Sequence, residues 1–477
     1  MAITAPTYDP VNTANSLADK YVMARQQILD VQNKEASATL KGLTELNSAI
    51  LAFQSSLTTV LGSGKSMYAQ AATFSDIAFG SATASATAAA GTYSFFVKQL
   101  AAANQVSYTA LTDDTGVGGM LKINLGTSGT GGVTTIEVDM ALADADNNGT
   151  LTTRELATAI NGATGNTSLV TASIVTTGTD AGGRPISELV LTAKNTGLNS
   201  KITLDTSGVT GVSSLKEANE ALPAALRVRT LVAEQDAEIR IGSENGTAIT
   251  QATNTFTNID GVKMSFTKAH KSGDAPLTIT VGADSAGTTA NVQAFVDAYN
   301  KLKGVLNRLT YAGDPSTGAA AGAFAHDGGI RALNDRMVSL LRPTTTGDTL
   351  ASFGIIATKD GSLELRSDRL QAQLALKPTG LDVIIGSASS SPPTGIAGAL
   401  DKFLKGWSSS ADGQIKKRKE ATTDKQELLA DRQAFLDKQH EAAYSRYLKQ
   451  FTALASMQGV MNNNVSMFDA LFGNDKK

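Results

Sequence analysis

Apolar residues near both ends of the chain recur at the spacing of a helix that buries one narrow stripe. Near the N-terminus they are separated by three and four residues in turn, at Leu43, Leu46, Ile50, Phe53, Leu57 and Val60. Near the C-terminus the same spacing is followed by Tyr447, Phe451, Leu454 and Met461, with Gln458 at the remaining position. This heptad pattern is typical of helices that pack along a seam. Residues 415–461 contain no proline and one glycine, which predicts one long helix, with or without a break.

A helix with a single narrow apolar stripe must bury that stripe against a partner. The two ends can pack on each other within one monomer, or another subunit can complete part of the stripe. The pattern leaves both readings open, because a heptad repeat sets a seam but not its partner. The candidate leg and subunit contacts, some of which would instead be intramolecular core, are Leu43, Ile50, Phe53, Leu57, Tyr447, Phe451, Leu454 and Met461.

The extreme ends carry little sign of stable structure. Residues 1–20 are polar and interrupted by proline, and residues 462–477 hold a short apolar cluster in a polar context. Ends of this kind are usually mobile until a partner orders them.

The middle of the chain has the pattern of short strands separated by glycine-rich turns. Tyr93, Phe95 and Val97 alternate with their neighbours, as a half-buried strand requires. Further strands are expected at 121–125, 134–140, 168–175, 187–193, 236–242, 262–268 and 277–282. The βαβ alternation of parallel sheets is absent from the pattern, so antiparallel sheets are expected. A helical pattern returns at residues 291–306.

The order helix, strands, helix predicts a multidomain α+β protein. Paired N- and C-terminal helices would form a coiled-coil or helical-bundle stalk, with antiparallel β-rich head domains inserted between them. The expected domains are a flexible terminal leg (1–42 and 445–477), a helical bundle (43–92 and 286–444), a β-rich head (93–122 and 231–285) and a second head (123–230).

Composition narrows the function classes. A chain of 477 residues is too long for a single ordinary domain core. Hydrophobic residues make up 42% and charged residues 18%, which indicates a folded chain. A net charge of -3 offers no basic excess for nucleic acid, and the lack of cysteine excludes disulfides and thiolate chemistry. No stretch approaches the roughly 20 apolar residues of a membrane span, and the N-terminus lacks the apolar core of a Sec signal peptide. We therefore expect no nucleic-acid partner, no membrane insertion and, if the protein is secreted, another export route.

Residues 144–155, DADNNGTLTTRE, fit the pattern of a calcium-binding loop. The ligand positions are filled by Asp144, Asp146, Asn148, Thr150 and Glu155. A helix is expected after the loop but a strand before it, unlike an EF-hand. The alternative is an Asp/Asn/Gly turn that caps the following helix. We expect no required cofactor, with a structural Ca²⁺ as the one candidate.

Enzyme chemistry finds little support in the sequence. The three histidines are His270, His326 and His440, and no two have the spacing of metal ligands. Neither a phosphate-binding loop nor a nucleophile elbow is present. The basic run at 416–419 is followed by acidic residues on the same predicted helix, as on a solvated face.

Five blocks of packing and turn residues follow one another along the chain, at 91–107, 236–268, 292–302, 350–365 and 446–462. The first is GTYSFFVKQLAAANQVS, with Val97, Leu100 and Ala101, and the fourth is LASFGIIATKDGSLEL, with Gly354 and Asp360. In this order the blocks resemble the flagellar hook-associated protein 2 family of filament caps.

The resemblance implies a non-enzymatic cap exported through the flagellar type III channel to the distal filament tip. It implies a homo-oligomeric ring that retains exported flagellin and promotes its folding and insertion. Its partners would be flagellin, other flagellar axial proteins and an export chaperone. Two alternatives are a surface adhesin whose β-rich head binds host or surface glycans, and another axial subunit such as flagellin itself.

Overall fold

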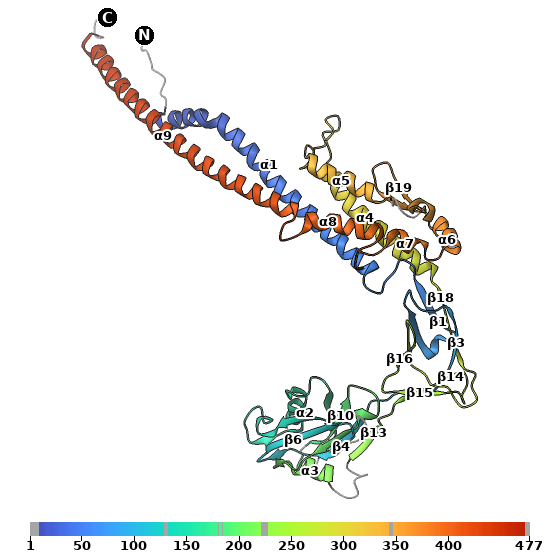
Figure 1. Cartoon of the computed structure of the whole chain (residues 1–477). Coiled ribbons are helices and arrows are strands. Elements are labelled where there is room, and N and C mark those ends of the chain that lie inside the picture. Colours follow the sequence, from blue (N-terminus) through green and yellow to red (C-terminus); the bar gives the residue numbers. More distant parts are fainter. Residues whose placement is uncertain are drawn as a thin grey trace, which may run out of the picture. The chain divides into compact units, whose positions relative to one another are not determined.

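The computed structural model describes residues 9–127, 132–179, 181–183, 185–220, 228–342 and 347–472. The chain forms two compact units, one of Met1–Tyr68 and Ser285–Lys477, the other of Ala69–Asp284 (Figure 1). The first is mainly helical and the second is built from antiparallel sheets. The α+β class with terminal helices around inserted antiparallel sheets is therefore confirmed.

The helical unit is organised around two long helices, one from each end of the chain. They are α1 (Pro10–Leu61) and α9 (Gln414–Phe472), and they lie side by side. The shorter helices are α4 (Ser285–Leu309), α5 (Gly328–Leu340), α6 (Ser367–Leu376), α7 (Gly380–Ile385) and α8 (Gly395–Ser408). The long C-terminal helix predicted from residue 415 is one unbroken element.

Helix α1 begins within the segment that we expected to lack structure. The Asp9 side chain accepts a hydrogen bond from the Val11 amide at 2.9 Å, and Pro10 occupies the first helical position. Both features favour a helix start, because they satisfy or remove amide groups that the helix leaves unpaired. The expectation for residues 10–20 was therefore wrong, and at the other end α9 extends to Phe472. Residues 1–8 and 473–477 lie outside the described residues.

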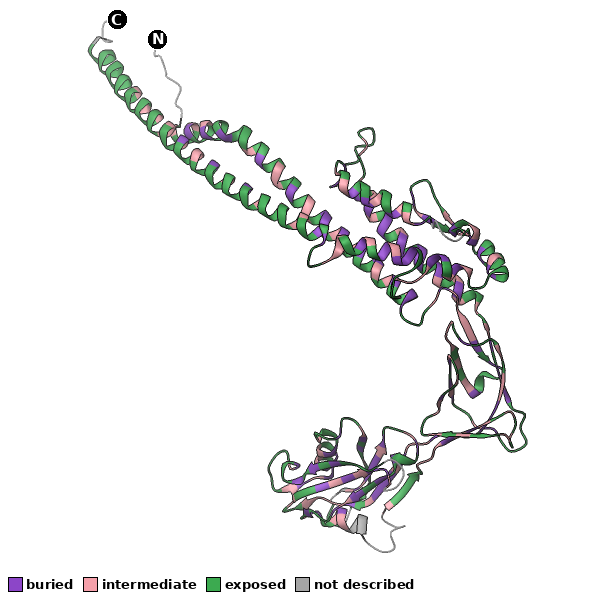
Figure 2. Cartoon of the chain, viewed as in Figure 1, coloured by how far each residue is buried: buried purple, intermediate pink, exposed green. Residues whose placement is uncertain are grey.

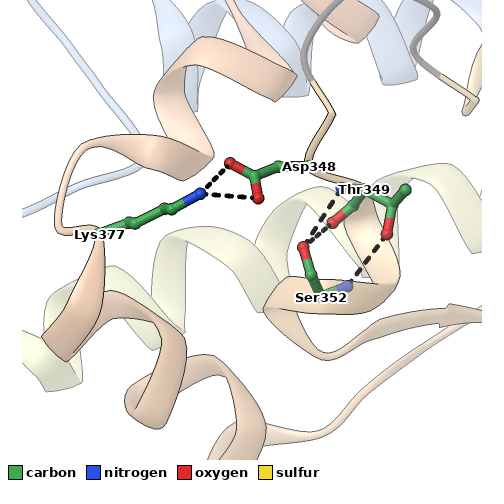
Figure 3. Close-up of polar contacts among 4 residues, drawn as sticks. All are labelled: Asp348, Thr349, Ser352 and Lys377. Carbon is green, nitrogen blue, oxygen red and sulfur yellow. Dashed lines mark hydrogen bonds and ion pairs between the residues drawn. The ribbon is translucent and has the colours of Figure 1, made fainter.

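One resembling block, 350–365, forms a short turn and hairpin in the helical unit. It contains the 3-10 helix η5 (Leu350–Phe353), β19 (Ile355–Ala357) and β20 (Leu363–Leu365). Thr349 and Ser352 exchange capping hydrogen bonds, and the Lys377 ammonium lies 2.8 and 3.0 Å from the two Asp348 carboxylate oxygens (Figure 3). Gly354 ends the turn at a φ of 76°, which favours glycine. The capping bonds and Gly354 together set the turn that leads into the hairpin.

The sheet unit contains two cores. The first belongs to the five-stranded sheet β1-β18-β3-β14-β15 and the three-stranded sheet β16-β17-β2. Its strands are β1 (Gln70–Phe74), β2 (Gly80–Ala84), β3 (Gly91–Gln99), β14 (Ala237–Ile241), β15 (Ala248–Gln251), β16 (Thr255–Ile259), β17 (Val262–Phe266) and β18 (Leu277–Ala283). All pairs in these two sheets are antiparallel.

The second core lies between two further sheets and helix α2 (Thr153–Gly162). One sheet has the order β13-β4-β10-β9, and in the other β6 pairs with β7, β11 and β12. The strands are β4 (Gln105–Leu111), β6 (Gly118–Leu125), β7 (Thr134–Asp139), β9 (Val170–Thr179), β10 (Pro185–Ala193), β11 (Ile202–Asp205), β12 (Val209–Thr210) and β13 (Val228–Val232). Helix α3 (Ser213–Glu220) and the short pair β5 (Asp114–Thr115) and β8 (Thr150–Leu151) complete it.

Several predicted domain boundaries differ from the structure. The leg and the bundle were expected to be separate domains, but they lie in one unit and α1 and α9 run unbroken through both. The helical bundle was expected to reach residue 92, but α1 ends at Leu61 and strands β1 and β2 belong to the sheet unit. The second head was expected to begin at residue 123, but Val106 and Leu121 already lie in its core. In the last two places tertiary pairing decides the boundary. Strands β1 and β2 carry few large apolar residues, and β4 belongs to the second head because it pairs with β10 and β13.

Candidate functional site: terminal helices and an acidic loop

The four predicted contacts on α1 lie in the core of the helical unit. Leu43, Ile50, Phe53 and Leu57 are at most 2% exposed. They pack with apolar residues of α4, and the Phe53 ring meets the Tyr299 ring edge-on at 6.4 Å between centroids. The structure thus brings these residues together as core within one monomer, which is the first of the two readings left open by the pattern.

The four predicted contacts on α9 have a different environment. Tyr447 and Phe451 are half-buried, whereas Leu454 is 44% and Met461 is 69% exposed. Within the part of α9 whose side chains are described, residues up to 471, no residue after Ala443 is buried, as the green ribbon in Figure 2 shows. The exposed apolar side chains beyond that point are Leu454, Met457, Val460, Met461, Val465, Met467, Phe468 and Leu471. This end of α9 therefore exposes an apolar surface to water.

Between these two regions, α1 and α9 pair through a thin seam. Its buried cluster contains five residues: Val22, Leu29, Ala36, Leu429 and Leu436. Each helix contributes one apolar residue per heptad, which is half of the usual seam. The pair is therefore held by little apolar burial along this stretch.

Polar pairs fix the register of the two helices beside this seam. Gln26 and Gln433 exchange side-chain hydrogen bonds at 2.9 and 3.0 Å. The His440 ring nitrogen Nε2 lies 2.8 Å from an Asp19 oxygen. The glutamine pair is half-buried, so a shifted alignment of the helices would leave its amide groups unpaired.

The acidic loop brings three of its predicted ligands together. One carboxylate oxygen each of Asp144, Asp146 and Glu155 lies within 4.8 Å of the other two. These are the only three His, Cys, Asp or Glu side chains so grouped in the part of the chain that the structure describes. Asn148 lies in the same loop, where its side-chain oxygen accepts from the Thr150 amide at 2.8 Å. The spacing of the sequence therefore folds into a compact oxygen-rich turn.

The elements around the loop follow the predicted order. Strand β7 and a single 3-10 turn, η2 (Met140–Leu142), precede it, and helix α2 follows. Glu155 also forms a capping box with Thr152 at the start of α2, and the hydrogen bonds from Thr152 lower the pKa of the Glu155 carboxyl. The ligand set and the capping turn thus coexist, so the two readings of this segment do not exclude each other.

The histidines are separated in the fold. His270 lies in the sheet unit, stacked between Phe79 and Phe96 at 4.2 and 4.6 Å between ring centroids. His326 and His440 belong to the helical unit, where His326 is exposed.

The pattern missed a buried cation in the helical unit. Lys303 of α4 is 4% exposed, donates to the Asn334 side chain at 2.6 Å, and has a pKa lowered by burial. Lys303 falls at the helical spacing of the apolar face of α4, and this spacing could have predicted that its side chain is buried.

Paired terminal helices with antiparallel sheets inserted between them make this fold similar to that of a flagellar cap protein of known structure. The crystal structure of the D1-D2-D3 domains of the flagellar cap protein FliD from Escherichia coli matches this chain with a TM-score of 0.55 and 26% identity. The match covers 80% of this chain and 99% of that one. No described helix carries an apolar stretch long enough to cross a membrane.

Sequence comparison names the family. The family model of the flagellar hook-associated protein 2 C-terminus matches residues 234–463, and that of its N-terminus matches residues 8–104. The B-type flagellar hook-associated protein 2 of Pseudomonas aeruginosa is 30% identical over 97% of this chain and 95% of its own length. Flagellar hook-associated protein 2 of Escherichia coli K12 is 28% identical over 97% and 96%. The chain belongs to the flagellar hook-associated protein 2 family, a family of structural flagellar proteins, and the resemblance stated above is confirmed.

Proposed function

We propose that the protein is secreted by flagellar type III export and caps the distal tip of the growing filament as a homo-oligomeric ring. There it retains exported flagellin and promotes flagellin folding and insertion. Other axial proteins and an export chaperone are further partners. The observation that supports this function is the exposed apolar end of α9, from Leu454 to Leu471, in a chain of this family.

The physical argument starts from the cost of exposing that surface. Each Å² of apolar area removed from water contributes about 25 cal/mol, so neighbouring helices are favoured to cover the stripe. A ring of subunits would bring several such helix ends close together. An incoming flagellin confined beneath the ring loses little further entropy when its own helices dock. The cap acts by geometry and confinement and requires no reacting group.

A deletion and complementation experiment tests this function. Loss of the gene should abolish swimming and release unpolymerised flagellin into the medium, and the full-length chain should reverse both effects. The double variant Leu454→Asp with Met461→Asp should not restore them. The matched control is Asn463→Asp, which adds a charge at an exposed polar position of the same helix. A full-length chain that leaves flagellin in the medium would refute the proposal.

We further propose that the acidic loop binds a structural Ca²⁺. The grouped oxygens of Asp144, Asp146 and Glu155 support this, because calcium takes six to eight hard oxygen ligands from a loop of this pattern. The ion would stiffen the head in calcium-bearing medium. Calorimetric titration tests the site, and absence of heat at millimolar calcium would remove it. Adhesion to surface glycans through the head stays a prediction.

A further inference from the structure

The groove between α1 and α9 has an apolar border on one side of the thin seam. It has a volume of about 620 Å³, and Ile28 of α1 and Phe435 of α9 both line it. Their side chains are 61% and 63% exposed. Leu29 and Leu436, the seam residues, lie at its floor. Two large apolar side chains thus flank a groove whose floor is already apolar.

The border follows the same heptad register as the seam. Ile28 and Phe435 each directly precede a seam residue. One heptad away on the same helix faces, Tyr21 and Leu428 are also exposed apolar residues. The apolar stripe therefore continues along both helices with a period of seven, which is the pattern that a helix with the same repeat can cover.

The charges in the groove are of both signs. Arg25 and Arg432 line it together with Asp431. Arg25 donates to the neutral amide oxygen of Gln439 and lies over the Tyr21 ring, so neither of these contacts supplies a carboxylate. The surface is self-complementary, because Asp431 of one copy can face an arginine of another.

We infer that this groove is the contact through which the stalks of neighbouring copies of this chain pair. Phe435 and Ile28 of one copy cover the apolar border of the other, and Asp431 lies opposite a guanidinium. A second copy is the occupant because it supplies the same heptad register and the opposite charge at once. The inference rests on the proposed function, in which copies assemble as a ring, and it assigns the stalk surface that they use.

The opposite side of the same two helices provides the control. There Met23 is 53% exposed and lines a second groove with Gln27 and His440. It is an exposed apolar residue on α1, as Ile28 is, but it lies beside the polar pairs. A substitution at Met23 therefore alters exposed apolar surface without touching the proposed contact.

Sedimentation equilibrium of the purified full-length chain tests the contact. Phe435→Asp should raise the dissociation constant of self-association at least about tenfold, as loss of a central apolar anchor does. Asp431→Arg should also raise it, and because Asp431 is exposed this variant does not remove a buried side chain. Met23→Asp should leave the constant unchanged. Circular dichroism confirms that each variant keeps its helices.

Cross-linking gives an independent readout, because the natural chain has no cysteine. A single Phe435→Cys substitution should give linked dimers with a short bis-maleimide, and Met23→Cys should not. The inference is overturned if Phe435→Asp and Asp431→Arg associate as the wild type does. It is also overturned if the wild type is monomeric, or if the groove binds flagellin and no second copy. If the groove variants still assemble and restore swimming, this contact is refuted and the proposed function stands. If the wild type fails to restore swimming, the proposed function is refuted.

Discussion

Replacing Phe53 with alanine separates the two roles that the heptad pattern allows for this residue. As a subunit contact, Phe53 would affect association and leave the folded monomer intact. In the structure it is 1% exposed and packs edge-on against Tyr299, with an angle of 75° between the rings. We therefore expect Phe53→Ala to destabilise the helical unit of the monomer.

The size of the effect follows from the buried ring. Truncating a fully buried phenylalanine to alanine costs about 3–5 kcal/mol through lost apolar transfer and the cavity that remains. This loss of unfolding free energy, divided by a urea m-value of roughly 3 kcal/mol per molar, lowers the urea concentration at the unfolding midpoint by about 1–2 M.

The chain contains a built-in probe for this measurement. Trp407 is its single tryptophan and packs against the core of the helical unit, so its fluorescence reports on that unit. The matched control is Phe435→Ala, whose side chain is 63% exposed and whose loss should change monomer stability by less than about 0.5 kcal/mol. An unchanged Phe53→Ala midpoint, or a shift that disappears on dilution, would refute the reasoning.

Three further predictions concern buried polar groups and the acidic loop. Tyr299→Phe should leave the helical unit unchanged or stabilise it by about 1 kcal/mol, since the buried hydroxyl has no hydrogen-bond partner among the described residues; the Trp407 urea curve measures this. Burial lowers the pKa of His270, whose Nδ1 accepts from the Val97 amide at 2.9 Å. The unfolded chain therefore binds more protons than the folded one, and the sheet unit should lose stability as the pH falls below about 6.5. Thermal unfolding at a series of pH values measures this loss. Asp144→Asn should weaken calcium binding at least about tenfold in calorimetry.

The histidine and calcium predictions each have a control variant. Nearby charges act on His270 from Asp274, which raises its pKa, and from Lys268, which lowers it. His270→Gln should flatten the pH dependence, whereas Gln at the exposed His326 should not. Asp205→Asn, on a half-buried carboxylate of the sheet unit, should leave calcium binding intact. A destabilised Tyr299→Phe variant would contradict the first prediction. A pH dependence that His270→Gln leaves unchanged would contradict the second, and full calcium binding by Asp144→Asn would contradict the third.

Local patterns predicted the two long terminal helices and eight of the strands, but most of the short strands were not predicted. The alternation at Tyr93, Phe95 and Val97 belongs to β3, and the helical spacing from 291 to 306 belongs to α4. Strands β1 and β2 were missed, because QAATF and GSATA consist largely of small residues without clear alternation. Their pairing with β18 and β17 stabilises them, and these partners lie about 180 to 210 residues away along the chain.

The candidate sites also differ in whether the sequence could predict them. The ligand pattern and the following helix were readable from residues 144–155, since a calcium-type loop is continuous in sequence. The groove beside Phe435 was not, because its two walls come from opposite ends of the chain and meet only when α1 and α9 pair.

By itself the sequence determined that both ends are helices with one apolar stripe, because periodicity fixes which side chains share a face. The tertiary structure alone decided what covers that face. Leu43 and Leu57 are buried by α4 and its neighbours, whereas Leu454 and Met461, at similar spacing, remain exposed. The physical reason is that burial depends on which distant residues arrive at a surface, and a local repeat carries no information about them.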